Sequence, residues 1–223
     1  MNRMRALYLL ASLALIDLTY GQGLPEAKIS ENQLRRVISA PFKLEGDVLT
    51  ITYDWQKDTQ INDFELVGPK PLRTTPVLQL EPGSALKHKV KFLDAFKMDG
   101  KMILGSRKGV HIESSSGLSI SCSSYNAWFV TIFVKGAEIA NEVFDPGYNK
   151  ATDLGAYFPI GLRIDSGAVI LNWDKVKIGG KFDGPFGHVI LLGGSGGNKF
   201  GKLVISGVLD KEWAMEAIAL ANP

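Results

Sequence analysis

The sequence predicts an all-β protein, an antiparallel β-sandwich that ends in a short helix. About a dozen short segments carry apolar residues at every second position, which is the pattern of half-buried strands. Glycine, proline, asparagine and aspartate separate these segments, and the chain has almost no long pattern of helical period. Its 223 residues and 45% hydrophobic content suit one sizeable core, so we expect a single folded domain.

The N-terminus has the pattern of a secretory signal peptide over residues 1–21. Arg3 and Arg5 precede an uncharged stretch, 6–16, and small residues then permit cleavage after Gly21. A membrane anchor is the other interpretation, but a helix over 6–16 extends only about 17 Å, whereas the hydrocarbon core of a bilayer is about 30 Å thick. We therefore expect an exported protein, secreted or periplasmic, with no membrane span after cleavage.

Residues 22–40 are expected to form a linker between the signal peptide and the folded domain. A short amphipathic helix fits the end of this linker, and Pro41 would stop it. The domain is then expected to span residues 41–223.

The expected strands follow one another from the first alternating segment, 49–55. The segment 127–134, AWFVTIFV, is nearly all apolar and rich in β-branched and aromatic residues, which predicts a central strand buried on both faces. Lys135-Gly136 and Asp165-Ser166-Gly167 are expected to form tight hairpin turns. The other expected strands are 64–67, 77–80, 86–96, 101–104, 109–113, 118–122, 137–144, 157–164, 168–173 and 176–178.

The last fifth of the chain predicts two strands joined by a glycine-rich turn and followed by a helix. The strands and the turn occupy residues 187–207, and Asp210 is a suitable N-cap for the helix. The helix would place Trp213, Ala217 and Leu220 on one face, with Trp213 holding it against the sandwich.

These C-terminal motifs resemble the end of a laminin-G-like or concanavalin-A-like jelly roll. In that family a late strand runs into Leu-Gly-Gly, as at Leu192-Gly193-Gly194, and Phe-x-Gly opens the last core strand, which Phe200-Gly201 matches in order and approximate spacing. An acidic segment then closes the domain, as at Leu209-Asp210-Lys211-Glu212-Trp213, and 127–144 resembles the family's central hairpin. The resemblance implies a jelly-roll lectin or glucanase type of domain in a secreted bacterial protein.

Glycosidases built on this sandwich use two carboxylates on one strand face, and the chain offers one weakly matching pair. It has no Glu-x-Asp-x-Glu motif, and the nearest pair is Asp63 and Glu65 in NDFELV. That segment resembles the opening of secreted jelly-roll domains related to keto-sugar glycoside hydrolases. A solvated strand face or a turn is the other interpretation of the pair. We expect no catalytic residue, with glycoside hydrolysis of the keto-sugar or glucanase type through Asp63 and Glu65 as the alternative.

Aromatic and amide residues near predicted turns are candidates for glycan binding. Sandwich domains recognise sugars with exposed aromatic rings and nearby amides and acids, and rim or core aromatics are the other interpretation. The candidates are Tyr125, Asn126, Tyr148, Asn149 and Trp173.

Metal ligation has less support than glycan binding. Asp145 and Asp153 lie in one expected loop and could contribute to a structural Ca²⁺ site, which needs six to eight oxygen ligands. Aspartates that only form turns are the other interpretation, and we expect no cofactor.

The charge of the chain is close to balanced. It has 25 basic and 23 acidic residues, a net charge of +2. Binding to nucleic acid or to an anionic membrane calls for a basic surplus, so we expect neither partner. The expected function is therefore non-catalytic recognition of a glycan or an extracellular protein, with a purely structural envelope protein as a further alternative.

Overall fold

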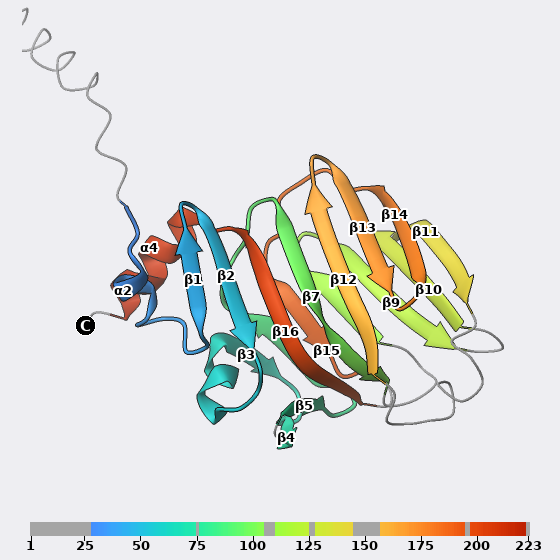
Figure 1. Ribbon diagram of the computed structural model, residues 1–223, viewed down its shortest axis with the longest axis horizontal. Helices are drawn as coiled ribbons and strands as arrows, with labels where there is room; N and C mark the ends of the chain where they lie inside the picture. Colours follow the sequence, from blue (N-terminus) through green and yellow to red (C-terminus); the bar gives the residue numbers. More distant parts are fainter. Residues whose placement is uncertain are drawn as a thin grey trace, which may run out of the picture.

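The computed structural model describes residues 28–74, 76–104, 110–124, 128–144, 157–194 and 197–221. Within them, two antiparallel sheets pack face to face (Figure 1), so the predicted β-sandwich is confirmed. The alternating burial of the strands explains this packing, because each sheet turns one apolar face toward the other.

The larger sheet has nine strands among the described residues. Its main path runs β1-β2-β16-β7-β12-β13-β14, with β5 pairing to β16 and β4 pairing to β5. The strands are β1 (Phe42–Glu45), β2 (Val48–Tyr53), β4 (Leu72–Thr74), β5 (Val77–Leu80), β7 (Phe96–Leu104), β12 (Tyr157–Asp165), β13 (Ala168–Trp173), β14 (Val176–Lys181) and β16 (Asn198–Val208).

The smaller sheet has seven strands in the described part of the chain, in the order β11-β10-β9-β8-β15-β6-β3. Its strands are β3 (Phe64–Val67), β6 (Ala85–His88), β8 (Val110–Ser114), β9 (Leu118–Ser124), β10 (Trp128–Val134), β11 (Ala137–Phe144) and β15 (Val189–Leu192). A 3-10 helix, η1 (Asp58–Asp63), leads into β3, and α2 (Glu31–Leu34) and α4 (Lys211–Leu220) lie together beside β1 (Figure 1).

The core is filled from both sheets, and aromatic rings form a continuous series at one end of it. Successive ring centroids lie 3.7–6.2 Å apart, and each such contact adds about 0.5–1.5 kcal/mol to the burial of the rings. The series runs through Trp55, Tyr53, Phe64, His88, Phe92, Phe96 and Phe186.

Residues 28–40 belong to the fold, which corrects the expectation that this part of 22–40 is a linker. Leu34, Ile38 and Ala40 are buried in the same core as the strands. A capping box at Ser30 starts α2, as the side chain of Ser30 and that of Gln33 each accept a backbone N–H of the other. The burial of these apolar side chains draws the segment onto the sandwich.

The predicted C-terminal helix is present as α4, and its cap is confirmed. Oδ1 of Asp210 accepts the backbone N–H of Trp213 at 3.1 Å. The buried face was predicted incorrectly, however, since Ala214 and Ile218 are its buried residues and Leu220 is 86% exposed. Trp213 is partly buried against the core beside this face.

The expected strand 86–96 is two strands separated by a crossing between the sheets. β6 ends at His88 in the smaller sheet, and β7 begins at Phe96 in the larger one. Val90 and Phe92 are buried in the segment that connects the two sheets. Buried and less buried residues therefore continue to alternate there, although the segment is not part of either strand. Periodicity alone therefore does not reveal this break.

Both hairpin turns expected from the sequence are confirmed. Lys135 and Gly136 have φ of 49° and 81°, and Ser166 and Gly167 have φ of 51° and 78°. Two successive residues with positive φ are typical of the type I′ turns that match the twist of paired strands.

Candidate functional site

The outer face of the seven-stranded sheet carries a mixture of polar and aromatic side chains. Strand register places one residue from each strand in a row across this face. From β11 to β3 the row is Glu138, Phe133, Ser119, Glu113, Ile190, Lys87 and Glu65.

A second row on this face runs through Thr131. Thr131 pairs with Asn141 on one side and Ser121 on the other. Thr131 and Ser121 are only 7% and 9% exposed although they point away from the core. Phe129 and Phe133 lie two residues before and after Thr131, roughly 13 Å apart along the strand. Two partly exposed rings therefore flank the buried Thr131.

A shallow hollow of about 340 Å³ adjoins Phe133. Glu113, Ser119 and Lys135 also line it, and Ser119 Oγ donates to Glu113 Oε1 at 3.5 Å. The hairpin turn fixes Lys135 at the rim, because its backbone N–H donates to the carbonyl of Gly117 at 2.7 Å. We call these four residues, Glu113, Ser119, Phe133 and Lys135, together with Phe129 and Thr131 on the same strand as Phe133, the Phe133 site.

Sequence reasoning missed the Phe133 site because AWFVTIFV is so apolar. The run predicts burial on both faces, whereas β10 lies next to the edge strand β11 and its outward rings are half-buried. Thr131 in the middle of the run was the available signal, since a hydroxyl at every-second-residue spacing from two rings marks an outward face.

Asp63 is buried and holds the N-terminal segment in place. Its side chain is 1% exposed and accepts the backbone N–H groups of Ser39 at 2.6 Å and Ala40 at 3.0 Å. Tyr53 Oη also donates to it, at 3.0 Å. Burial raises the pKa of Asp63, and these hydrogen bonds act in the opposite direction.

Glu65, unlike Asp63, is exposed to solvent. Its side chain is exposed on β3, and its carboxylate lies 3.6 Å from Lys87 Nζ. One carboxylate is inside the protein and the other faces solvent, so the structure does not bring Asp63 and Glu65 to a common accessible surface.

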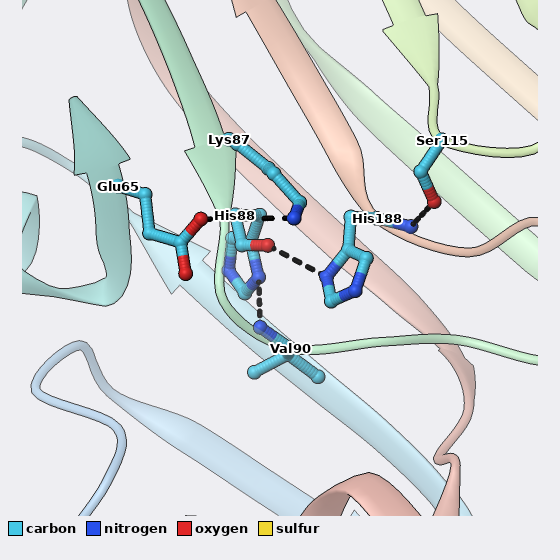
Figure 2. A network of polar contacts seen from close by, with 6 residues as sticks. All are labelled: Glu65, Lys87, His88, Val90, Ser115 and His188. Carbon is cyan, nitrogen blue, oxygen red and sulfur yellow. Dashed lines mark hydrogen bonds and ion pairs between the residues drawn. The ribbon is translucent and has the colours of Figure 1, made fainter. Parts of the chain in front are cut away.

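Two histidines, His88 and His188, lie near Glu65 and Lys87 in a network of polar contacts (Figure 2). His88 Nδ1 accepts the backbone N–H of Val90 at 3.0 Å, so its ring proton lies on Nε2, 2.5 Å from Tyr53 Oη. His188 Nδ1 donates to the His88 carbonyl at 2.9 Å, and the backbone N–H of His188 donates to Ser115 Oγ at 2.9 Å. Burial lowers the pKa of His88 to about 3, so the ring is neutral and inaccessible to a substrate.

Trp173 is fully buried, which corrects its assignment to a ligand-binding surface. A stacking platform needs an exposed ring, and this one is 0% exposed within the core. The other predicted ligand residues, Tyr125, Asn126, Tyr148 and Asn149, lie outside the described residues.

The predicted metal ligands Asp145 and Asp153 also lie outside the described residues. Within the part that the structure describes, no group of three metal-ligating side chains comes together. A larger hollow of about 730 Å³ has carboxylates of Asp94, Asp165 and Asp183 at its rim. Two of them have other partners, since Asp183 pairs with Lys181 at 3.0 Å and Asp165 accepts the Ser166 hydroxyl at 2.9 Å.

No helix among the described residues is long and apolar enough to cross a bilayer. No protein-family model and no curated protein matches the chain.

Several solved structures share the architecture at low sequence identity. The lumenal domain of VIP36, in a Ca²⁺- and Man3GlcNAc-bound form, aligns with a TM-score of 0.52 and 12% identity over 70% of this chain and 86% of its own. A Bacillus licheniformis β-glucanase aligns with a TM-score of 0.52 and 6% identity over 70% and 97%. The CBM2 module of the evolved Dit protein of Lactobacillus casei BL23 phage J-1 aligns with 0.54 and 6% over 71% and 94%. The chain therefore has the concanavalin A-like jelly-roll fold that lectins and glucanases share.

Proposed function

We propose that this protein is an exported domain that binds a glycan at the Phe133 site without cleaving it. The observation that carries the proposal is the hollow beside Phe133, in which a partly exposed ring adjoins a carboxylate, a hydroxyl and an ammonium group. A ring can cover the apolar face of a sugar, and the three polar groups can exchange hydrogen bonds with its hydroxyls. Similar structures with a bound mannose glycan or a carbohydrate-binding module support the same chemistry.

Binding is favoured over hydrolysis by the separation of the carboxylates on this face. Glu113 and Glu138 lie in the same row but three strands apart, which is roughly 14 Å. Retaining glycosidases hold their two carboxyl groups about 5–5.5 Å apart and inverting ones about 6.5–9.5 Å apart. The pair Asp63 and Glu65, the alternative from the sequence, has one buried member and one exposed member.

Replacing Phe133 by alanine is expected to weaken glycan binding about tenfold, or about 1.4 kcal/mol, because the stacking surface is lost. Binding is measured with the mature protein on an array of mannose and β-glucan oligosaccharides and then by titration calorimetry with the best ligand. Glu113→Gln, which keeps the shape of the side chain, is expected to weaken binding without changing the thermal midpoint. Ile170→Ala truncates an exposed apolar residue on the opposite sheet and is the control.

If the wild-type protein bound no oligosaccharide on the array, the proposal would be contradicted. Equal losses of glycan affinity for Phe133→Ala and Ile170→Ala would also contradict it. Release of reducing ends from a bound oligosaccharide, abolished by Glu113→Gln, would instead show catalysis at this site.

Export is the second part of the proposal, and it depends on the signal-peptide pattern of residues 1–21. Expression of the full chain in a bacterium with a Sec pathway is expected to yield a periplasmic or secreted product that begins at Gln22. N-terminal sequencing checks this. A cell-associated product that retains Met1 would contradict it, and Gly21→Pro, which should block cleavage, is the control.

A further inference from the structure

The outer face of the nine-stranded sheet is strongly basic. On the five strands from β16 to β14, outward positions carry seven basic side chains and two acidic ones, Asp99 and Asp165. The basic residues are Lys97, Lys101, Arg163, Lys177, Lys181, Lys199 and Lys202, and we call this set the basic face.

One row of the opposite outer face is weakly acidic. It holds three glutamates, Glu65, Glu113 and Glu138, and one lysine, Lys87. The net charge of +2 therefore conceals an uneven distribution, in which basic side chains gather on the outer face of the nine-stranded sheet. Composition alone indicated no anionic partner, whereas the arrangement in space provides a surface for one.

Two cations of the basic face lie directly opposite each other across neighbouring strands. Lys97 of β7 pairs in register with Arg163 of β12, and both point outward. Like charges in this position destabilise a sheet. Asp99 lies 2.7 Å from Lys97 Nζ, but none of the described carboxylates forms an ion pair with Arg163. A bound anion would relieve the repulsion that the fold tolerates here.

The spacing of the cations suits an extended polymer. Lys97 and Lys101 lie roughly 13 Å apart along β7, and Lys177 and Lys181 have the same spacing along β14. The two pairs are three strands apart, roughly 14 Å. Lys97 and Lys181 also pair with Asp99 and Asp183, at 2.7 and 3.0 Å, in exposed ion pairs that a polyanion can displace. No single small anion can contact all four ammonium groups, whereas a chain of charged units can lie across them.

The remaining outward residues favour a sugar polymer over a bilayer or a nucleic acid. Thr50, Thr52, Ser206, Asn172 and Asp99 offer hydroxyl, amide and carboxylate groups that can exchange hydrogen bonds with sugar hydroxyls. The described side chains of this face include no exposed aromatic ring for stacking on bases. Its exposed large apolar residues, Val48, Leu72 and Ile170, lie on β2, β4 and β13, and none of these three strands pairs with another of the three, so they form no patch for insertion into lipid.

We propose that the basic face binds an anionic polysaccharide, one that carries carboxylate or sulfate groups along its chain. This site lies on the other sheet from the Phe133 site and does not depend on it. The protein would then hold a charged matrix on one face while it recognises a glycan on the other.

The test measures binding of the full mature protein to dextran sulfate and to polygalacturonate, with neutral dextran of the same length as the reference polymer. We expect binding to both charged polymers, none to neutral dextran, and a loss of about tenfold in affinity when salt rises from low to physiological concentration. The double variant K97Q/R163Q is expected to bind at least about tenfold more weakly. K70Q/K89Q removes the same charge from exposed positions outside the basic face and should change affinity less than twofold.

The outcomes separate this proposal from the first one. Phe133→Ala should leave polyanion binding unchanged, and K97Q/R163Q should leave array binding unchanged. Equal losses for K97Q/R163Q and K70Q/K89Q would overturn the proposal, because binding would then follow net charge alone. Equally tight binding to phosphatidylserine vesicles or to single-stranded DNA would also overturn it, since the surface would then respond to any polyanion. Both variants should fold, and removing the Lys97–Arg163 repulsion should keep the thermal midpoint at or above that of the wild type.

Discussion

Replacing Asp63 by alanine is expected to lower the free energy of unfolding by about 3–5 kcal/mol, the range seen when one partner of a buried charged network is removed. Three donors would lose their acceptor together, namely the backbone N–H groups of Ser39 and Ala40 and the hydroxyl of Tyr53. Tyr53 and Ala40 are buried, so two of these donors would be left where water does not reach readily, whereas Ser39 is exposed. Urea unfolding followed by tryptophan fluorescence measures the loss.

Two further variants show whether the buried carboxylate is responsible. Tyr53→Phe removes one of the three hydrogen bonds and is expected to cost about 1–2 kcal/mol. Glu65→Ala removes the neighbouring carboxylate of NDFELV, whose exposed ion pair with Lys87 contributes at most about 1 kcal/mol. A loss below about 1 kcal/mol for Asp63→Ala would show that the N-terminal segment is held by its apolar contacts alone.

Asp63 also shows how far the sequence predicts a carboxylate's role. Its position two residues before Glu65 allows a pair on one strand face, and nothing in the local sequence excludes that arrangement. The structure ends η1 at Asp63 and begins β3 at Phe64, so the two residues do not share one strand. The partners of Asp63 are 10, 23 and 24 residues away in sequence, and such distant contacts leave no local pattern.

The strands were more predictable than the sites because strand burial has a local signature. β3, β5, β11 and β13 have the bounds expected from alternation and breakers alone. The strand over 86–96 failed for a topological reason, since the residues of a crossing segment can alternate in burial without pairing in a sheet. The basic face was invisible for a similar reason, because its cations come from four strands, β7, β12, β14 and β16, spread over residues 96–208 of the chain.

Acidification below pH 6.5 is expected to destabilise the protein through His88. Burial lowers the pKa of this ring to about 3, and its neutral form accepts from Val90 and faces Tyr53 Oη. An unfolded chain restores the ordinary pKa of about 6.5, so only the unfolded state takes up this proton between those values. The contribution of His88 is therefore complete above pH 6.5 and declines by up to about 1.4 kcal/mol for each pH unit as the pH falls toward 3.

The neighbours of His88 modify this slope in known directions. The pKa of His188 is also lowered, chiefly by burial. Lys87 lowers this pKa further, whereas Glu65 raises it. The titration of His188 therefore adds to the destabilisation in acid. Asp63 opposes it, because burial raises the pKa of its carboxyl and the folded state then takes up a proton first as the pH falls. Burial raises the pKa of Tyr53 well above its ordinary value, so its hydroxyl stays protonated throughout this range.

Urea unfolding at pH 7.5, 6.0 and 5.0 measures the effect, and His88→Gln isolates it. Glutamine offers both an acceptor and a donor but takes up no proton, so this variant is expected to be less stable than the wild type at pH 7.5 and to lose less stability on acidification. His188→Gln is the control for the half-buried ring and should flatten the profile less. Identical slopes for the wild type and His88→Gln would show that the buried ring does not govern acid stability. The buried chain from His88 through Tyr53 to Asp63 would then act only as a structural tether for residues 38–40, a role that Asp63→Ala reports separately.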